Sequence, residues 1–227
     1  VVGFFSLRVL REGRERTVAS YSLSLARMIL DEVDEELYSN FARLGAYSKG
    51  GALQRAVEDA NAEFEKIQDR EAFIDREDKA WVSAKEDELT PLMRKLLDLP
   101  ISSSFLEEQA IDRKNLDYAL FPEILLTNRF GAVIALSNRT TDYRQNDEDW
   151  WKETWAKGYS FGSIDYDPSI GIFSLAIACR VDDAKGKPLG VLKGVLDVRE
   201  IGESLKKVQK NLPFKTGRFF LLDGNGR

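Results

Sequence analysis

The feature that most constrains the fold is a long amphipathic pattern near the start of the chain. From about Arg14 to Tyr47, mostly apolar residues recur at alternating intervals of three and four. The positions are Leu23, Ala26, Leu30, Val33, Leu37, Asn40, Leu44 and Tyr47. The period predicts one helix of roughly 45–50 Å at 1.5 Å per residue, which is longer than one small domain can cover. Met28, Ile29 and Phe41 add part of a second apolar face. We therefore expect one face to pack on its own domain and the other on a partner chain, although burial in a single bundle would also explain the pattern.

Glycines end this helix, and shorter helices follow it. Lys49-Gly50-Gly51 interrupts the pattern, and a second helix is predicted beyond it. Its apolar side carries Leu53, Val57, Ala60, Phe64 and Ile67. The run Leu89–Leu99 predicts a further helix, which Thr90-Pro91 would begin as N-cap and first helical residue. Ser104 followed by Glu107 matches a capping box and predicts the start of another short helix.

The pattern changes from helix to strand at Pro122. Runs rich in β-branched residues, separated by turn residues, predict strands. The predicted strands are Glu123–Thr127, Ala132–Ser137, Gly171–Val181, Leu189–Val198 and Arg218–Leu222. Short helices are predicted at Asp149–Lys157 and Glu200–Lys210. The chain is therefore expected to be α+β, with a long N-terminal helix packed on a mostly antiparallel sheet of about five strands and with short flanking helices.

The connection Thr141–Trp151 joins the first two predicted strands to the first of these helices. Its sequence, TDYRQNDEDWW, combines a tyrosine and two adjacent tryptophans with several acidic and amide side chains. Aromatic rings beside fixed carboxylates form a good wall for a small ligand, because they offer apolar area and a few orienting polar groups. Alternatively, one of the two tryptophans fills the core where the helix begins.

Composition narrows the function classes. The chain has no histidine, so the usual catalytic triads and histidine metal sites cannot form. An enzyme would have to use carboxylates, lysine or tyrosine, for example a hydrolase acting through Glu148 and Asp165. We expect neither an enzyme nor a cofactor. The net charge of −5, without a basic stripe, argues against nucleic-acid binding. Cys179, the single cysteine, is expected to be a small core residue.

Three motifs follow one another in the second half of the chain. The motif E-I-x-L-T-x-x-x-G-x-V covers Glu123–Val133, and D-Y-x-Q-x-D-E-x-W-W covers Asp142–Trp151. The third, D-x-x-G-x-P-x-G-V-L, covers Asp183–Leu192. In this order and spacing they resemble the Cache family of extracytoplasmic sensor domains, over about Phe121–Val198. The long helix before them resembles the family more loosely.

The resemblance implies a PAS-like sheet on a long dimer-forming helix, outside the cytoplasmic membrane of a bacterium or archaeon. Such domains sense small molecules for histidine kinases, chemoreceptors or cyclic-dinucleotide enzymes, which are anchored in the inner membrane by segments outside the domain. Residues 1–50 would be the dimerisation helix and 51–212 the ligand-binding module. Residues 213–227 would begin a second, membrane-proximal module, because Arg218–Arg227 resembles the first strand of one.

The resemblance also suggests ligand-binding residues. In family members that bind amino acids, the connection carries a tyrosine, an arginine for the ligand carboxylate and an aromatic pair, and a later aspartate binds the ligand amine. Tyr143, Trp150 and Trp151 match this pattern, and Asp197 lies near the aspartate position. Glu148 stands where the arginine would be. The expected ligand is therefore not a typical α-amino acid but an amine or a polar neutral metabolite, provided that Glu148 and Tyr143 face the site beside Trp150.

Two interpretations stay open. Asp165 and Tyr166 would supply contacts at the rim of the site, or Asp165–Asp167 would form a turn set up by Pro168. For the whole chain, the alternative to a sensor is a structural dimerisation module of the same fold with a vestigial pocket.

Overall fold

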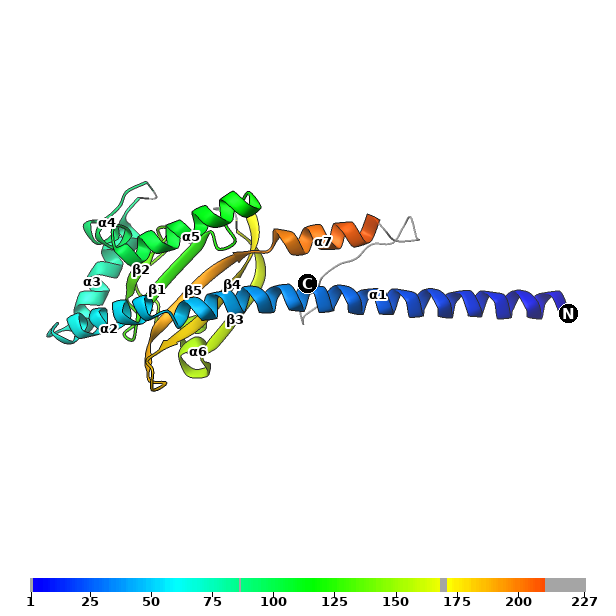
Figure 1. Cartoon of the computed structure of the whole chain (residues 1–227), viewed down its shortest axis with the longest axis horizontal. Helices are drawn as coiled ribbons and strands as arrows, with labels where there is room; N and C mark the ends of the chain where they lie inside the picture. The colour runs from blue at the N-terminus through cyan, green and yellow to red at the C-terminus, as the bar shows by residue number, and fades with distance from the viewer. Residues whose placement is uncertain (1, 86, 168–170, 211–227) are drawn as a thin grey trace. The chain divides into compact units, whose positions relative to one another are not determined.

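The computed structural model describes residues 2–85, 87–167 and 171–210 and confirms the predicted α+β class (Figure 1). The helices are α1 (Val2–Ser48), α2 (Gly51–Glu65), α3 (Arg70–Ser83), α4 (Pro91–Leu97), α5 (Pro100–Leu116), α6 (Asp149–Lys157) and α7 (Arg199–Lys210). The strands are β1 (Glu123–Asn128), β2 (Val133–Leu136), β3 (Tyr159–Asp167), β4 (Ile172–Asp182) and β5 (Pro188–Asp197). The long N-terminal helix and its end before Gly50-Gly51 agree with the sequence pattern.

The chain divides into two compact units. Of the described residues, those within 40–199 form one unit, which contains the whole sheet, and residues 2–39 with 200–210 form the other. All the candidate site residues lie in the 40–199 unit.

The sheet is antiparallel and has five strands in the order β2-β1-β5-β4-β3. β5 is therefore the central strand, with β1 and β4 as its neighbours. Residues directly opposite each other on antiparallel strands point to the same face. Leu126, Leu192 and Cys179 lie opposite one another on one face, which we name the closed face. Leu125, Lys193 and Ala178 lie opposite one another on the other face, which we name the open face.

The closed face packs tightly against the end of α1 and against α2. A Cβ atom at Gly190 would overlap the carbonyl oxygen of Thr127 and lie 2.8 Å from Cγ1 of Val57. A Cβ atom at Gly194 would lie 2.7 Å from the ring of Phe121 and 3.2 Å from Leu44. The two glycines of β5 thus allow the helices and the neighbouring strand to approach closely.

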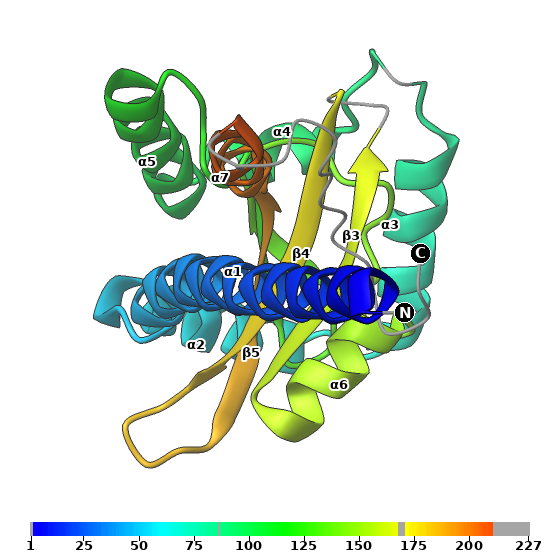
Figure 2. The same ribbon diagram turned by 90° about the vertical axis from the view of Figure 1, so that its right-hand side faces the viewer.

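On the open face, α3 and α4 cover the β1–β2 side, and α6 covers part of β4 and β5. Leu125, Leu136, Trp81 and Met93 belong to one buried cluster there. α2 and α5 lie on one side of the sheet and α3 and α6 on the other (Figure 2). The open face is therefore covered by separate short elements rather than by one long helix.

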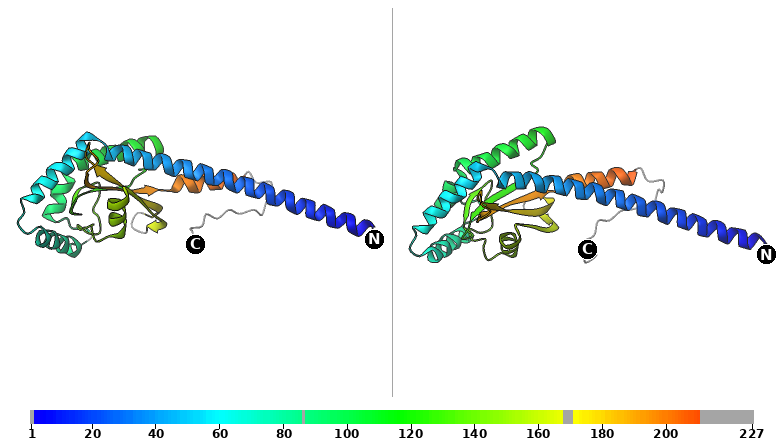
Figure 3. Two further views of the ribbon diagram at one scale, coloured as in Figure 1. Left: turned by 90° about the horizontal axis from the view of Figure 1, so that it is seen from below. Right: turned by 60° about the horizontal axis from the view of Figure 1, so that its bottom comes forward.

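Helices α2, α3 and α4 surround the turn between β1 and β2, at the left of each view in Figure 3. The ring centroids of Phe64 and Phe130 are 6.1 Å apart, and those of Phe64 and Phe73 are 5.7 Å apart. The buried side chain of Asn61 donates to the carbonyl of Leu189 at 2.8 Å and accepts from the backbone N–H of Arg129 at 3.1 Å. These contacts fix the hairpin on which the candidate site is built.

Two local predictions were wrong. Asp165–Asp167 is not a turn but the end of β3, a strand that the sequence did not predict. β3 is an exposed edge strand, so it contains serine, glycine and aspartate residues that are also typical of turns. Ser104 does not begin a helix, because α5 already begins at Pro100 with Leu99 as its N-cap. The predicted Thr90 cap is confirmed, since its hydroxyl accepts from the backbone N–H of Met93 at 3.2 Å. The predicted strand Arg218–Leu222 lies outside the described residues.

Candidate functional site

The connection between β2 and α6 is bound to the edge of the hairpin. The backbone N–H of Val133 donates to the carbonyl of Tyr143 at 3.1 Å, and that of Gln145 donates to Gly131 at 2.8 Å. Gly131 has a φ of 77°, and a Cβ atom there would overlap Asn146. Only glycine fits this position without strain, because it permits both the left-handed conformation and the close approach of the connection.

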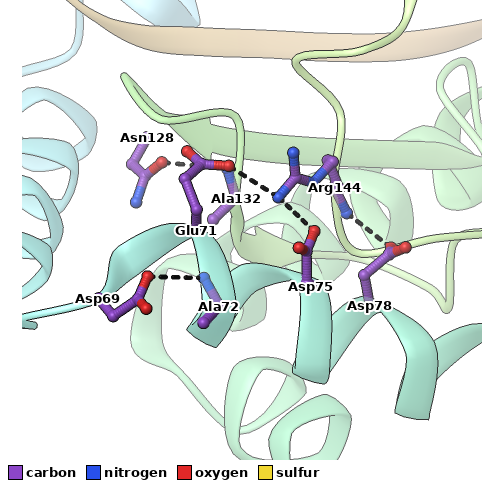
Figure 4. Close-up of polar contacts among 8 residues, drawn as sticks. All are labelled: Asp69, Glu71, Ala72, Asp75, Asp78, Asn128, Ala132 and Arg144. Atoms are coloured by element: carbon purple, nitrogen blue, oxygen red, sulfur yellow. Dashed lines mark hydrogen bonds and ion pairs between the residues drawn. The ribbon is translucent and has the colours of Figure 1, made fainter.

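Helix α3 holds the same connection from the other side (Figure 4). The carboxylate of Asp78 accepts the backbone N–H groups of Tyr143 and Arg144 at 2.9 and 3.0 Å. The guanidinium of Arg144 lies 3.0 Å from the carboxylate of Glu71 and 2.7 Å from that of Asp75. Three acidic residues on α3 thus fix the backbone and one side chain of the connection.

Tyr143 is a buried anchor of this arrangement, with 2% of its surface exposed. Its ring lies 5.6 Å from that of Trp81, whose indole N–H donates to the carbonyl of Thr140 at 2.9 Å. Burial raises the pKa of the Tyr143 phenol well above its usual value, so the side chain is neutral at physiological pH. Tyr143 therefore belongs to the buried core beneath the connection and carries no charge there.

The two adjacent tryptophans have different environments. Trp151 is buried against Ala178 and Val191, stacks on Trp155 at 5.0 Å, and donates its indole N–H to the Thr127 hydroxyl at 2.8 Å. Trp151 is thus the tryptophan that fills the core. Trp150 is half-buried and packs against both core clusters of the open face.

A half-buried patch lies on the open face beside Trp150. Cross-strand pairing places Val195 opposite Ala176 and Lys193 opposite Ala178. The Nζ atom of Lys193 lies 4.7 Å from the centroid of the Trp150 ring. We name this the open patch; it consists of Ser174, Ala176, Lys193, Val195 and the exposed part of Trp150. Sequence reasoning missed Lys193, although a single lysine within the apolar run Gly190–Val195 is an identifiable signal.

Glu148 and Asp197 have different surroundings. The Glu148 side chain is exposed at the N-cap of α6 and makes no capping hydrogen bond, so its part in an amine site stays a prediction. Asp197 lies on the open face, opposite Ser174. Asp197 is buried and accepts the backbone N–H and Nε of Arg199, each at 2.9 Å. Its carboxylate raises the pKa of the Arg199 guanidinium by accepting a hydrogen bond from it. The Asp197 charge is thus neutralised at the start of α7.

Asp165 and Tyr166 lie on opposite faces of the edge strand β3. Asp165 pairs with Ser174 and so lies on the open face, next to the open patch. Tyr166 pairs with Phe173 on the closed-face side, and their ring centroids are 5.2 Å apart. The structure therefore brings Trp150, Lys193 and Asp165 to one face and leaves Tyr166 on the other.

The remaining parts of the described structure add little to the site. A hollow of about 410 Å³ lies at the α3–α4 loop, lined by Ala84, Asp87, Glu88, Leu89, Thr90 and Arg94. None of the predicted site residues lines it. Across residues 2–85, 87–167 and 171–210, no group of acidic or sulfur side chains is placed to bind a metal ion. In the same residues, no helix has the length and hydropathy needed to cross a membrane.

No protein-family model matches the sequence, and no curated protein does. Among solved structures, one match is an extracellular ligand-binding receptor from Desulfohalobium retbaense, at 11% identity and a TM-score of 0.36, covering 71% of this chain and 27% of that one. The ligand-binding domain of the Pseudomonas aeruginosa amino-acid chemoreceptor PctC in complex with GABA matches at 15% identity and a TM-score of 0.36, covering 76% and 66%. The corresponding domain of PctB in complex with L-Arg matches at 17% identity and a TM-score of 0.36, covering 84% and 64%. The chain thus spans less than two thirds of each of these structures.

Proposed function

We propose that the chain is the small-molecule sensor domain of a transmembrane signalling protein and lies outside the cytoplasm, on the periplasmic side of an inner membrane. The observation that carries this proposal is the open patch beside Trp150. The connection that bounds the patch carries the residues on which the resemblance to Cache sensor domains rests, and α3 holds that connection in place through Asp78 and Arg144. Catalysis would belong to parts of the protein outside this domain.

The open patch has the composition of a small ligand site. Trp150 offers a flat apolar surface, and Ala176 and Ser174 are half-buried small side chains on β4. Lys193 and Asp165 provide charged groups at the same face. A bound molecule would contact both the connection and the central strand, so it could shift the balance between two positions of the connection.

The strand that carries Lys193 leads directly towards the C-terminal helix. β5 ends at Asp197, and α7 begins at Arg199, whose backbone N–H and side chain bind the Asp197 carboxylate. We therefore propose that a change at the open patch reaches the following segment through β5. This route uses continuous backbone and needs no separate coupling element.

A thermal-shift screen tests the proposal against the alternative of a structural module with a vestigial pocket. A ligand at 100 times its Kd stabilises the folded state by about 2.7 kcal/mol, whereas a vestigial site does not respond. Trp150→Ala should remove the response of any compound that binds the open patch. Leu106→Ala, at an exposed apolar position of α5, is the matched control and should keep it. A broad metabolite panel without a single Tm shift would contradict the sensor proposal.

We further propose that the domain forms a homodimer through α1. Leu23 and Leu30 are one heptad apart on α1, and their side chains are 55% and 50% exposed. Tyr21 and Met28 form a second exposed pair at the same spacing. Sedimentation equilibrium should detect a dimer that the double variant Leu23→Glu/Leu30→Glu loses and Ser24→Glu retains. A monomer at all concentrations in the unmodified chain would contradict this interface.

A further inference from the structure

The 40–199 unit continues into the rest of the chain at two places, along α1 and at the start of α7, and an arginine lies at each. Arg43 lies within one helical turn of residue 40 on α1, and Arg199 is the last residue of the unit. Each arginine pairs with a buried aspartate, Asp112 at 5% exposed and Asp197 at 3%. A buried carboxylate is costly unless it is paired, so both aspartates have a physical reason to keep their partners.

At the first place, Asp112 joins α1 to the segment 117–122, which connects α5 to β1. The Nη2 atom of Arg43 lies 2.6 Å from Oδ1 of Asp112 and 3.0 Å from Oε2 of Glu108, both on α5. The second carboxylate oxygen of Asp112, Oδ2, accepts the backbone N–H of Leu120 at 3.2 Å. One buried carboxylate therefore holds both the end of α1 and the α5–β1 segment.

At the second place, Asp197 joins α7 to the same segment. The backbone N–H of Asp197 donates to the carbonyl of Leu120 at 2.9 Å. Its carboxylate accepts from the backbone N–H and Nε of Arg199, each at 2.9 Å. The Arg199 guanidinium lies 4.2 Å from the ring centroid of Tyr118, another residue of the α5–β1 segment. Leu120 thus receives one contact from each side, on its N–H and on its carbonyl.

We propose that these contacts form a relay that couples the end of α1 to the first residue of α7, so that the two ends of the 40–199 unit respond together. The relay consists of Arg43, Asp112, Leu120, Asp197 and Arg199. Across the described residues, Arg43 and Arg199 make no contact with each other, so the coupling passes through the three residues between them. A shift of Leu120 that lengthens one of its two hydrogen bonds also changes the other.

The relay goes beyond the proposed function, in which β5 alone leads from the open patch to α7. Asp197 lies opposite Ser174 of the open patch, so the relay borders the candidate site and adds α1 to the elements that a change there would reach. The alternative is two independent ion pairs, each of which stabilises only its own part of the fold. Proximity does not separate these two interpretations, so a measured coupling is needed.

A double-mutant cycle on the whole chain measures the coupling. Arg43→Met and Arg199→Met each remove one terminal charge of the relay and keep an unbranched side chain. For independent ion pairs, the fold-changes in the unfolding equilibrium constant multiply in the double variant to within about twofold. The relay predicts a departure of threefold or more from that product. Arg43→Met with Arg180→Met is the matched control and should multiply, because Arg180 pairs with Asp182 at 2.7 Å, away from the relay.

Hydrogen exchange of the Arg199 amide, followed by NMR, gives a second readout that a local structural role of Arg43 would not move. This N–H donates to Asp197 at the start of a helix, where amides exchange by local opening rather than by global unfolding. It should exchange at least threefold faster in Arg43→Met than in the unmodified chain, and at an unchanged rate in Arg180→Met. Asp112→Asn, which keeps the size of the side chain and removes its charge, should act like Arg43→Met.

The relay is overturned if the double variant follows the product of the single variants, or if the Arg199 amide exchanges at the same rate in Arg43→Met, Asp112→Asn and the unmodified chain. If circular dichroism shows that the double variant is unfolded, the exchange rates in the single variants decide. Neither measurement uses a ligand, so the failure of the relay leaves the sensor proposal standing, and a thermal-shift screen without a response leaves the relay standing.

Discussion

The two faces of the sheet are built from the same strands but differ in how they are covered. On the closed face, Gly190 and Gly194 bring β5 so close to its neighbours that no side chain fits at either position. On the open face, the same strand carries Lys193 and Val195, and both remain half-buried. A strand alternates its side chains between the two faces, so β5 can serve both purposes with consecutive residues.

The difference separates residues that hold the fold from residues that are available to a ligand. Protein interiors tolerate little change of volume, so a change on the closed face acts on stability. A half-buried patch tolerates substitution, so a change there acts on binding. For neighbouring residues of β5, we therefore expect substitutions on the closed face to lower stability and substitutions on the open face to change binding.

The largest effect on stability is expected at Gly190. In Gly190→Ala, the new Cβ atom overlaps the backbone oxygen of Thr127, which cannot move without disturbing the β1–β5 pairing. We expect a loss of about 3 kcal/mol or more in the free energy of unfolding, measured by urea denaturation. Gly45→Ala is the matched control, because nothing lies within 4 Å of a Cβ atom at this helical glycine. It should stabilise α1 by about 0.5–1 kcal/mol.

A smaller effect is expected where α3 anchors the connection to the open face. Asp78→Ala leaves the backbone N–H groups of Tyr143 and Arg144 without their shared acceptor. A hydrogen bond to a charged group is worth about 1.5–3 kcal/mol, so we expect a loss in that range. Asp75→Ala, one helical turn away, removes only an exposed contact with Arg144 and should cost about 1 kcal/mol at most. Equal losses in the two variants would show that the backbone contacts of Asp78 do not anchor the connection.

Much of the architecture follows from periodicity, whereas the site depends on pairing that periodicity does not reveal. The heptad-like spacing of Leu23, Leu30, Leu37 and Leu44 predicts α1, and Thr90-Pro91 marks the start of α4. β3 was missed, because an exposed edge strand needs few apolar residues and its Ser160, Gly162 and Asp165 resemble a turn.

The candidate site shows the same limit at the level of single residues. The connection Thr141–Trp151 was identified from its aromatic composition, and its rings pack on the open face. Its role in binding a ligand stays a prediction. Its spacing cannot show that Glu148 is exposed, since the N-cap of α6 sets that orientation. Nor can it place Lys193 over Trp150, because that contact depends on the register between β5 and β4 and on where α6 packs.

A still smaller effect on stability is expected at Lys193. Lys193→Met removes a cation–π contact worth about 0.5–1 kcal/mol and replaces the ammonium group with an apolar side chain of similar length. We expect the free energy of unfolding to change by about 1 kcal/mol or less, in contrast with Gly190→Ala on the same strand. A loss as large as that of Gly190→Ala would show that Lys193 holds the fold and would remove the distinction between the two faces.

The last prediction compares the two faces through the reactivity of one thiol on each, and it needs no change in stability. Cys179 lies on the closed face with 4% of its surface exposed, and burial raises the pKa of its thiol to about 11. The pKa of the Cys179 thiol is higher in the folded state than in the unfolded state. Ionisation of the thiol therefore leaves the free energy of unfolding unchanged at neutral pH and lowers it as the pH rises from about 9 towards 11. Cys179 should therefore resist iodoacetamide between pH 7 and 9 and react promptly in denaturant.

A second thiol, introduced on the open patch by Ala176→Cys, should react with iodoacetamide in the folded domain. A ligand of the open patch should slow that reaction and leave the reaction of Cys179 unchanged. Equal resistance of the two thiols would show that the open face is as tightly covered as the closed one.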